Sequence, residues 1–276
     1  MPSDVEMTGD PIRIQHPEPL LGDFVDYYWY LNANEAEHRR ELSLPDGSID
    51  IIFNLGNMPM RFYDTEHRLH LYKSSVLCGP HSQYFSIDAA GEGKVVGIHI
   101  KPGGLRPFMR GSMNEVHNRL LPLDLVWGSL AIELHERLLE QRQPLDMFRI
   151  LDRSLPGLAC SPLVRSREIE YIRMNLLSHN VHDLVEQQGM SHRWLNHKFK
   201  EEIGLTPKAM SRILRFQQAL QLIHQGRAMD WAELALACGY YDQAHFCREF
   251  KAYSGITPGE YIPISGRHRN HVLASE

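Results

Sequence analysis

The sequence predicts a two-domain protein of the α+β class, in which a β-rich N-terminal domain is followed by an all-helical C-terminal domain. Three observations predict this division. Residues 12 to about 122 alternate short apolar runs with Gly, Pro and Asn breaks, a pattern typical of strands and turns. Apolar residues change to helical spacing near residue 125 and keep it from Leu163 onward. Within this second region, one helical pattern occurs twice.

The predicted elements follow in order along the chain. The clearest strands are residues 48–53, 75–78 and 94–100. Helices are predicted within residues 125–155, with one side formed by Leu130, Leu134, Leu138 and Leu139. A segment with Gly and Pro at its ends, 157–162, predicts a linker. We therefore expect one domain at residues 12–157 and a second at residues 163–264.

The bulk composition excludes several classes of protein. The 276 residues are 43% hydrophobic, which is enough for packed cores and argues against general disorder. No apolar run reaches transmembrane length, and the N-terminal residues lack a signal-peptide pattern. The four cysteines form no C-x-x-C pair, so neither a zinc knuckle nor a disulfide framework is indicated. We expect a protein of the reducing cytoplasm with no membrane partner.

The net charge of −5 is unevenly distributed. Residues 1–160 contain 15 Lys and Arg against 22 Asp and Glu, whereas residues 161–276 contain 14 against 12. The C-terminal region is therefore slightly basic, at +2. This asymmetry is too small to predict a nucleic-acid partner by itself, because a helical domain can gather a few basic residues on one face.

The internal repeat is the most informative pattern in the chain. The motif F-K-x-x-x-G-L/I-T-P begins at Phe199 and again at Phe250, 51 residues later. The same offset relates Leu195 to Phe246 and Ser191 to Asp242. Further upstream, the offset becomes 50 for the pairs Gly189 and Gly239, and Leu184 and Leu234. The one-residue difference falls in a turn, so each copy is a helix, a turn and a second helix.

Residues suited to helix ends stand at matching places in both copies. Ser191 and Asp242 can accept hydrogen bonds from free N–H groups at the start of the second helix. Gly189 and Gly239 can adopt the left-handed conformation that ends the first helix. Each copy closes with Thr-Pro, where Thr suits an N-cap and Pro the first helical position. The pattern predicts two helix-turn-helix units, at about 181–202 and 230–252.

The second helix of each unit has an apolar face and a polar face. Leu195 and Phe199 in the first copy, and Phe246 and Phe250 in the second, are expected to pack inward. Ala244 and Cys247 are expected to point outward among the polar residues. The outward side chains expected to contact DNA are Arg193, Asn196, His197, Lys200, Gln243, Ala244, His245, Arg248 and Lys251.

These residue types suit a recognition helix in the major groove. Arg favours guanine and Asn or Gln favours adenine, while Lys200 and Lys251 suit phosphates. The alternative interpretation is that these side chains form ordinary solvated faces of a small helical bundle. Two copies with matched caps favour the DNA-binding interpretation.

Residues 208–225 predict one unbroken helix between the units, with an apolar stripe of Ile213, Phe216, Leu220 and Ile223. Eighteen residues make a helix about 27 Å long. Because one turn of DNA is about 34 Å, this connector can present both recognition helices to successive major grooves.

The repeat resembles the AraC/XylS family of bacterial transcription regulators over about residues 164–262. The resemblance depends on Leu195-x-x-x-Phe199-Lys200-x-x-x-Gly204-x-Thr206-Pro207, Ala219, Ala235-x-x-x-Gly239-Tyr240 and Phe246-x-Arg248-x-Phe250-Lys251-x-x-x-Gly255-x-Thr257-Pro258-x-x-Tyr261. It implies a domain that binds double-stranded DNA and usually activates transcription, with RNA polymerase as a further partner. By motif position, it implies DNA contacts from Arg193, Asn196, His197, Gln243, Ala244, His245 and Arg248. Two positions that are often Arg in the family are His197 and Ile262 here.

The N-terminal region resembles the β-rich sensor domain of a subset of that family. The matching residues are Leu44-Pro45-Asp46-Gly47, 50–53, Gly79-Pro80 and Gly97-x-x-x-x-Pro102-Gly103-Gly104. The resemblance implies a cupin-like β-barrel, followed by helices near 125–155 that mediate dimerisation. A homodimer and a small-molecule effector are therefore expected.

Four histidines of the first region raise the possibility of metal chemistry: His67, His70, His81 and His99. A cupin-like barrel can hold metal through histidines and a carboxylate, but the usual H-x-H pair is absent. Cys78 fits a small buried residue, and no Ser/His/Asp set or phosphate-binding glycine loop is present. We expect that the protein binds no metal or cofactor and is not an enzyme. A metal-dependent barrel enzyme fused to a DNA-binding domain is kept as an alternative.

The aromatic group Phe24, Tyr27, Tyr28, Trp29 and Tyr30 suits either a ligand pocket or a core strand with alternating faces. Asp50, Arg61 and Lys101 are candidates to hold a polar ligand, and the sequence does not select among them. The leading hypothesis is an activator that responds to a ligand in its N-terminal domain. The other hypothesis is a regulator whose N-terminal domain only dimerises or binds another protein.

Overall fold

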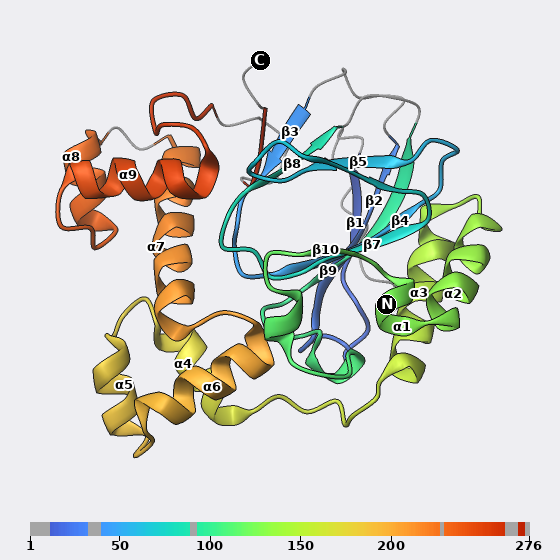
Figure 1. Ribbon diagram of the computed structural model, residues 1–276, viewed down its shortest axis with the longest axis horizontal. Helices are drawn as coiled ribbons and strands as arrows, with labels where there is room; N and C mark the ends of the chain where they lie inside the picture. Colours follow the sequence, from blue (N-terminus) through green and yellow to red (C-terminus); the bar gives the residue numbers. More distant parts are fainter. Residues whose placement is uncertain (1–11, 33–39, 89–92, 227–228, 263–269, 274–276) are drawn as a thin grey trace.

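The computed structural model describes residues 12–32, 40–88, 93–226, 229–262 and 270–273. Figure 1 shows a β-rich part with helices beside it and a separate group of helices from the second half of the chain. The predicted two-part α+β architecture is confirmed. Among the helices in the described ranges, none is long and apolar enough to cross a membrane.

The strands form two antiparallel sheets. The first has the order β1 (Ile12–Gln15), β2 (Val25–Asn32), β9 (Lys94–Ile100), β4 (Ile49–Asn54), β7 (Ser75–Cys78) and β10 (Leu120–Pro122). The second has the order β11 (His271–Leu273), β3 (Arg40–Ser43), β8 (Phe85–Asp88), β5 (Met60–Tyr63) and β6 (Leu69–Tyr72). The predicted strands at 75–78 and 94–100 have these bounds, and the one at 48–53 begins and ends one residue later.

The expectation of a cupin-like barrel is wrong, because the described strands do not close into a barrel. A barrel requires its edge strands to hydrogen-bond to one another. In the described part of the chain, β1 and β10 are the edges of the first sheet and pair with no strand of the second. The two sheets therefore stay separate, and their contact is made by side chains.

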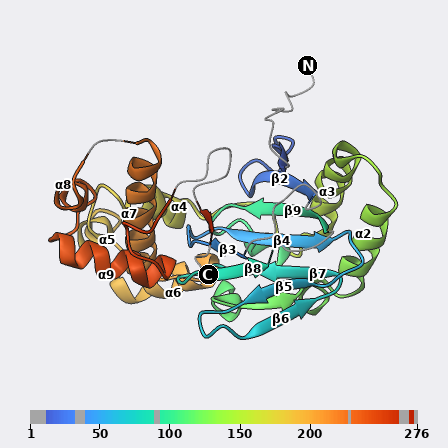
Figure 2. The ribbon, with the colours of Figure 1, turned by 90° about the horizontal axis from the view of Figure 1, so that it is seen from above.

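Alternation along the central strand β4 explains this layering. Ile49, Ile51 and Phe53 belong to a core shared with helices, whereas Ile52 belongs to a cluster with Phe62 on the second sheet. The helices of the first core are α1 (Asp124–Trp127), α2 (Ser129–Leu139) and α3 (Pro144–Leu158). The first sheet thus has these helices on one face and the second sheet on the other. Figure 2 shows α2 and α3 on one side of the strands and the C-terminal helices on the opposite side.

Helix α2 buries a narrower stripe than the leucine spacing predicts. Leu134 and Leu138 are fully buried, together with Ala131. Leu130 and Leu139, expected on the same side, are 46% and 51% exposed. The inner face follows the i, i+3, i+7 positions 131, 134 and 138, so the outer leucines flank the contact with the sheet.

The C-terminal helices surround a second core. They are α4 (Arg167–Asn175), α5 (Val181–Gln187), α6 (His192–Ile203), α7 (Pro207–His224), α8 (Trp231–Ala237) and α9 (Gln243–Ser254). The expectation that everything after Leu163 is helical is wrong for β11, which pairs antiparallel with β3 of the N-terminal part. The chain therefore returns to the second sheet after the last helix.

The two parts of the molecule are in direct contact. The core of the C-terminal helices includes Leu42 and Leu44 from the N-terminal part, both buried. The buried side-chain amide of Gln217 on α7 donates to the Pro45 carbonyl at 2.8 Å. Helix α6 also packs against the 3-10 helix η3 (Met113–Val116). These contacts hold the helical part against the sheets.

Candidate DNA-binding interface

The first helix-turn-helix unit consists of α5 and α6. Gly189, two residues after the end of α5, has a positive φ of 62°, which glycine adopts without strain. The Ser191 hydroxyl then accepts a hydrogen bond from the Trp194 N–H at 3.1 Å. Both capping roles expected from the sequence are present, and they fix where the second helix begins.

The second unit consists of α8 and α9 and repeats this construction. Gly239 has a φ of 74°, and Asp242 Oδ1 accepts from the His245 N–H at 2.6 Å. The closing Thr-Pro differs between the copies. Thr206 caps α7 by accepting from Ala209, as expected, whereas Thr257 begins only a turn and donates its hydroxyl to Glu260.

The inward faces of both recognition helices are buried as predicted. Leu195, Phe199, Phe246 and Phe250 each have 0% exposure. On α7, the Phe216 ring lies 5.3 Å from Phe250, centroid to centroid, in an edge-on contact. The connector stripe is buried at Ile213, Phe216 and Leu220 and partly buried at Ile223. One apolar core therefore holds both units to α7, with α6 and α9 near its opposite ends (Figure 1).

The outward faces differ slightly from the sequence prediction. On α6, the four candidate residues Arg193, Asn196, His197 and Lys200 are all exposed. On α9, the exposed candidates are Gln243, Ala244, Arg248 and Lys251. Cys247, expected outward, is only half-exposed and packs against the helical core. The polar faces of both helices are thus open to a partner.

His245 is the candidate whose side chain is most constrained. Its Nε2 lies 3.4 Å from Glu249 Oε1 one turn further along α9, and its ring packs edge-on against Tyr240. The Glu249 carboxylate is buried and also accepts from Arg212 Nε at 2.6 Å. His245 is therefore half-buried and held toward the helix axis, which limits its reach compared with Gln243.

Tyr241 was not singled out by the sequence. It is 86% exposed in the turn before α9, and Trp194, near the start of α6, is 39% exposed. The sequence does contain a signal for this residue, because the offset between the copies changes from 50 to 51 in this turn. Met190 alone separates Gly189 from Ser191, whereas Tyr240 and Tyr241 separate the matching residues of the second copy. The inserted residue is an exposed aromatic at the edge of the polar face.

Comparisons with known proteins agree with this geometry. Residues 184–263 match a family model described as a helix-turn-helix domain, and residues 13–122 match a domain of unknown function, DUF6597. Over 88 residues the chain is 30% identical to the HTH-type transcriptional regulator MtrA of Neisseria gonorrhoeae, covering 32% of this chain and 29% of MtrA. The C-terminal helices are therefore similar to the helix-turn-helix domains of transcription regulators.

Two further relatives are also regulators. The chain is 36% identical over 98 residues to the F1 operon positive regulatory protein of Yersinia pestis, covering 35% of this chain and 32% of that protein. It is 28% identical over 144 residues to the transcriptional activator RhaR of Klebsiella pneumoniae, covering 50% and 45%. These matches span less than half the length of each relative. All three relatives are named as regulators or activators, and none of the three is named as an enzyme.

The solved structures that align with this chain include ToxT from Vibrio cholerae. The alignment with ToxT has a TM-score of 0.46 at 12% identity and covers 91% of this chain and 97% of ToxT. The regulator CuxR aligns with a TM-score of 0.31 at 14% identity, covering 76% and 86%.

The N-terminal half of the chain contains a half-buried charged cluster. His99 Nδ1 lies 3.0 Å from Asp50 Oδ1, and its Nε2 lies 3.9 Å from Asp46 Oδ2. The Tyr27 ring stacks on His99 at a centroid distance of 4.6 Å. Burial opposes protonation of His99, but the two carboxylates outweigh it and raise its pKa to about 9. The imidazole is therefore a cation held between the two aspartates.

The other polar candidates of this half also have protein partners. Arg61 pairs with Asp88 at 3.6 Å, and Lys101 Nζ donates to the Gly22 carbonyl at 2.7 Å. In the aromatic group, Tyr28 packs with the helix-facing core while Trp29 packs on the opposite face of the sheet. The alternation of a core strand is thus observed on β2.

The four histidines considered as metal ligands lie in different places. His67 occupies the turn between β5 and β6, and His70 lies 3.3 Å from Asp64. His81 packs against Phe85, and burial lowers its pKa to about 4. Within the described ranges, no three His, Cys, Asp or Glu side chains are grouped as metal ligands. Cys78 is buried, and burial raises the pKa of its thiol.

Proposed function

We propose that the protein is a sequence-specific regulator of transcription that binds double-stranded DNA with α6 and α9. One observation gives this proposal its main support. Two capped helices bury matching apolar faces against one connector and leave matching polar faces exposed. The proposed DNA contacts are Arg193, Asn196, His197, Lys200, Gln243, Ala244, His245, Arg248 and Lys251.

The proposed contacts divide into two chemical kinds. Arg193, Asn196, Gln243 and Arg248 have side chains that can bond base edges in the major groove. Lys200 and Lys251 lie one to two turns further along their helices and suit phosphates. Because the two sets of base-contacting residues differ, the two DNA segments bound by one monomer should differ in sequence.

The length of α7 supports simultaneous contact by both units. Its 18 residues correspond to about 27 Å. Successive major-groove segments on one face of DNA are about 34 Å apart. The promoter site we propose therefore consists of two adjacent major-groove segments.

We further propose that a small effector acts through the N-terminal domain and that the protein activates transcription as a homodimer with RNA polymerase. Two of the relatives are named as a positive regulatory protein and a transcriptional activator, which supports activation. The hydrogen bond from Gln217 on α7 to the Pro45 carbonyl, in the segment between β3 and β4, supports a route from the N-terminal domain to the DNA-binding helices.

A second candidate role for the N-terminal domain is dimerisation or protein binding without an effector. It is favoured by the observation that Asp50, Arg61 and Lys101 all have partners within the chain. Analytical ultracentrifugation together with thermal shifts over a metabolite panel separates the two roles. A monomer stabilised by a metabolite favours sensing, and a dimer unaffected by the panel favours this second role.

The direct test uses the full-length protein and a DNA site selected from a random library. Affinity is measured for that site and a scrambled duplex at rising salt, with Arg193→Ala and, as a control, Arg153→Ala on the exposed side of α3. Binding should prefer the selected site, and the control should behave as wild type. Equal affinity for both duplexes at every salt concentration would contradict the proposal.

A further inference from the structure

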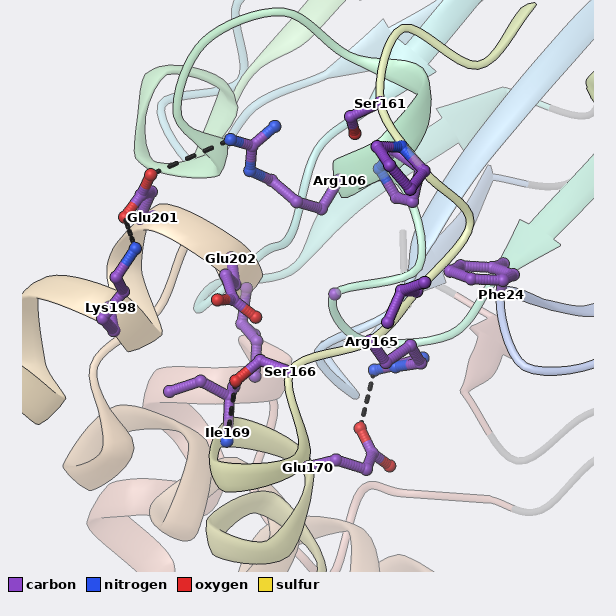
Figure 3. Close-up of a pocket in the computed structure, with 15 residues that line it drawn as sticks. Phe24, Arg106, Ser161, Arg165, Ser166, Ile169, Glu170, Lys198, Glu201 and Glu202 are labelled. Carbon is purple, nitrogen blue, oxygen red and sulfur yellow. Dashed lines mark hydrogen bonds and ion pairs between the residues drawn. The ribbon is translucent and has the colours of Figure 1, made fainter.

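A cavity of about 370 Å³ lies where the two domains meet (Figure 3). Its walls come from three parts of the chain. Phe24 and Arg106 belong to the N-terminal domain, Arg165 to the segment between α3 and α4, and Glu170 and Glu202 to helices α4 and α6. A molecule bound here contacts the N-terminal domain and the first helix-turn-helix unit at once.

Most charged groups around the cavity are already paired. Arg165 Nη2 lies 2.8 Å from Glu170 Oε2 and also donates to the Pro102 carbonyl. Lys198 Nζ lies 2.9 Å from Glu201 Oε2. These charges are already neutralised within the protein, so they require no charge from a ligand.

Glu202 is different. It is half-buried, and no cation in the described residues lies within 4.0 Å of its carboxylate. Burial raises its pKa above the ordinary glutamate range. Figure 3 shows its side chain between those of Arg106 and Arg165. A partly desolvated carboxylate without a close cation is a suitable acceptor for a cationic group.

Arg106 is the complementary group. Its Nη2 lies 3.8 Å from Glu201, whose other oxygen is already engaged by Lys198. Its Nη1 reaches the Met109 carbonyl only at 3.4 Å. Both contacts are long for a guanidinium, which retains capacity for a carboxylate.

The remaining lining is largely apolar. Phe24, Val164, Ile169 and Ile203 present hydrocarbon surface to the cavity. A ligand with only an anionic group would meet Glu202 without compensation, and one with only a cationic group would leave Arg106 unused. A molecule with both charges and an apolar side chain satisfies the whole lining.

We propose that this cavity, the junction pocket, binds a small zwitterion of the amino-acid class. Its ammonium group donates to Glu202, its carboxylate accepts from Arg106, and its apolar side chain packs on Ile203 and Phe24. Since Arg106 and Glu202 lie on different domains, the bound ligand fastens α6 to the N-terminal domain. An effect of the ligand on DNA affinity rests on the proposed function, whereas its binding does not.

The test compares molecules of similar shape and different charge. Full-length protein without DNA is titrated calorimetrically with L-leucine, 3-methylbutylamine and 4-methylpentanoate, and L-phenylalanine tests a larger side chain. At least one of the two amino acids should bind, and for leucine each singly charged analogue should bind at least tenfold more weakly. Binding of neither amino acid, or equal binding of leucine and an analogue, overturns the proposal.

Variants assign the binding to this cavity. Glu202→Gln and Arg106→Gln should each weaken amino-acid binding at least tenfold, while Glu140→Gln, exposed at the end of α2, should leave it unchanged. The unfolding temperature of each variant without ligand shows whether it is folded. If a variant does not fold, the titrations of the wild-type protein with leucine and its analogues test the proposal instead. Unchanged binding in folded Glu202→Gln also overturns the proposal. If the wild-type protein binds the amino acid but shows no sequence-specific DNA binding, only the proposed function is overturned.

Discussion

Gly204 and Gly255 end the two recognition helices in the same left-handed conformation, with φ of 86° and 77°, and both lie against the N-terminal domain. A Cβ on Gly204 would come within 2.6 Å of Pro80 Cγ and 2.8 Å of the Met113 carbonyl oxygen. A Cβ on Gly255 would come within 2.7 Å of the Tyr84 ring. Pro80 and Tyr84 belong to the same segment between β7 and β8, so one short segment contacts equivalent points of both units.

We predict that Gly204→Ala destabilises the protein more than Gly189→Ala does. Both residues have a positive φ, which costs alanine roughly 1–2 kcal/mol. Only Gly204 also meets backbone at the domain contact, since nothing lies within 4 Å of a Cβ on Gly189. Urea denaturation of the full chain measures the difference. Equal losses for the two variants would show that the contact at Gly204 contributes nothing to stability.

Arg248 and Lys251 should affect DNA binding differently. Arg248→Ala should weaken binding to the selected site by about 1–3 kcal/mol and relax the base preference at one position, because the contact we propose for its side chain is a base edge. Lys251→Ala should weaken binding to all duplexes alike and reduce the salt dependence. Fluorescence anisotropy over a set of single-base variants of the site measures both. A uniform loss in Arg248→Ala would reassign that residue to phosphate contact.

Tyr241 should contribute to affinity without contributing to stability. Its side chain is almost wholly exposed, so Tyr241→Ala should leave the free energy of unfolding unchanged. A hydrogen bond from its hydroxyl to a phosphate should contribute about 0.5–1.5 kcal/mol on any sequence. Tyr241→Phe, which keeps the ring, should lose nearly as much as Tyr241→Ala. Wild-type affinity in both variants would place Tyr241 outside the interface.

The pair of His99 and Asp50 should make stability fall at alkaline pH. The pKa of His99 is raised to about 9 in the folded protein, against about 6.5 in the unfolded chain. Its contribution is therefore complete below pH 6.5 and is lost as the pH rises through 9, by on the order of 3 kcal/mol. Chemical denaturation at pH 6, 7.5 and 9 measures the slope, which His99→Gln should flatten. An unchanged slope in that variant would contradict a charged His99.

The features that the sequence predicted well are local ones. The caps at Ser191 and Asp242 depend on residues three positions apart, and the inward faces of α6 and α9 depend on helical spacing. Strands such as β7 and β9 are short, mostly apolar runs next to turn residues, so their bounds could also be predicted. In each case the determining residues are close neighbours in the chain.

The features that the sequence missed depend on distant contacts. Strand β11 forms only because the chain returns to β3, more than 220 residues away in sequence. The pairing of His99 with Asp50 requires adjacent strands β4 and β9, and the division into two sheets depends on which edges pair. The junction pocket combines residues of both domains and the linker. No local pattern in one sequence specifies these arrangements.

Hydroxyl-radical footprinting of the full-length protein on its selected DNA site tests the central claim most directly. With both helix-turn-helix units engaged, two protected segments should appear on one face of the duplex, about one helical turn apart. Arg193→Ala should weaken protection of one segment, and Arg248→Ala should weaken protection of the other. A single protected segment, or protection that does not depend on sequence, would contradict binding by two recognition helices.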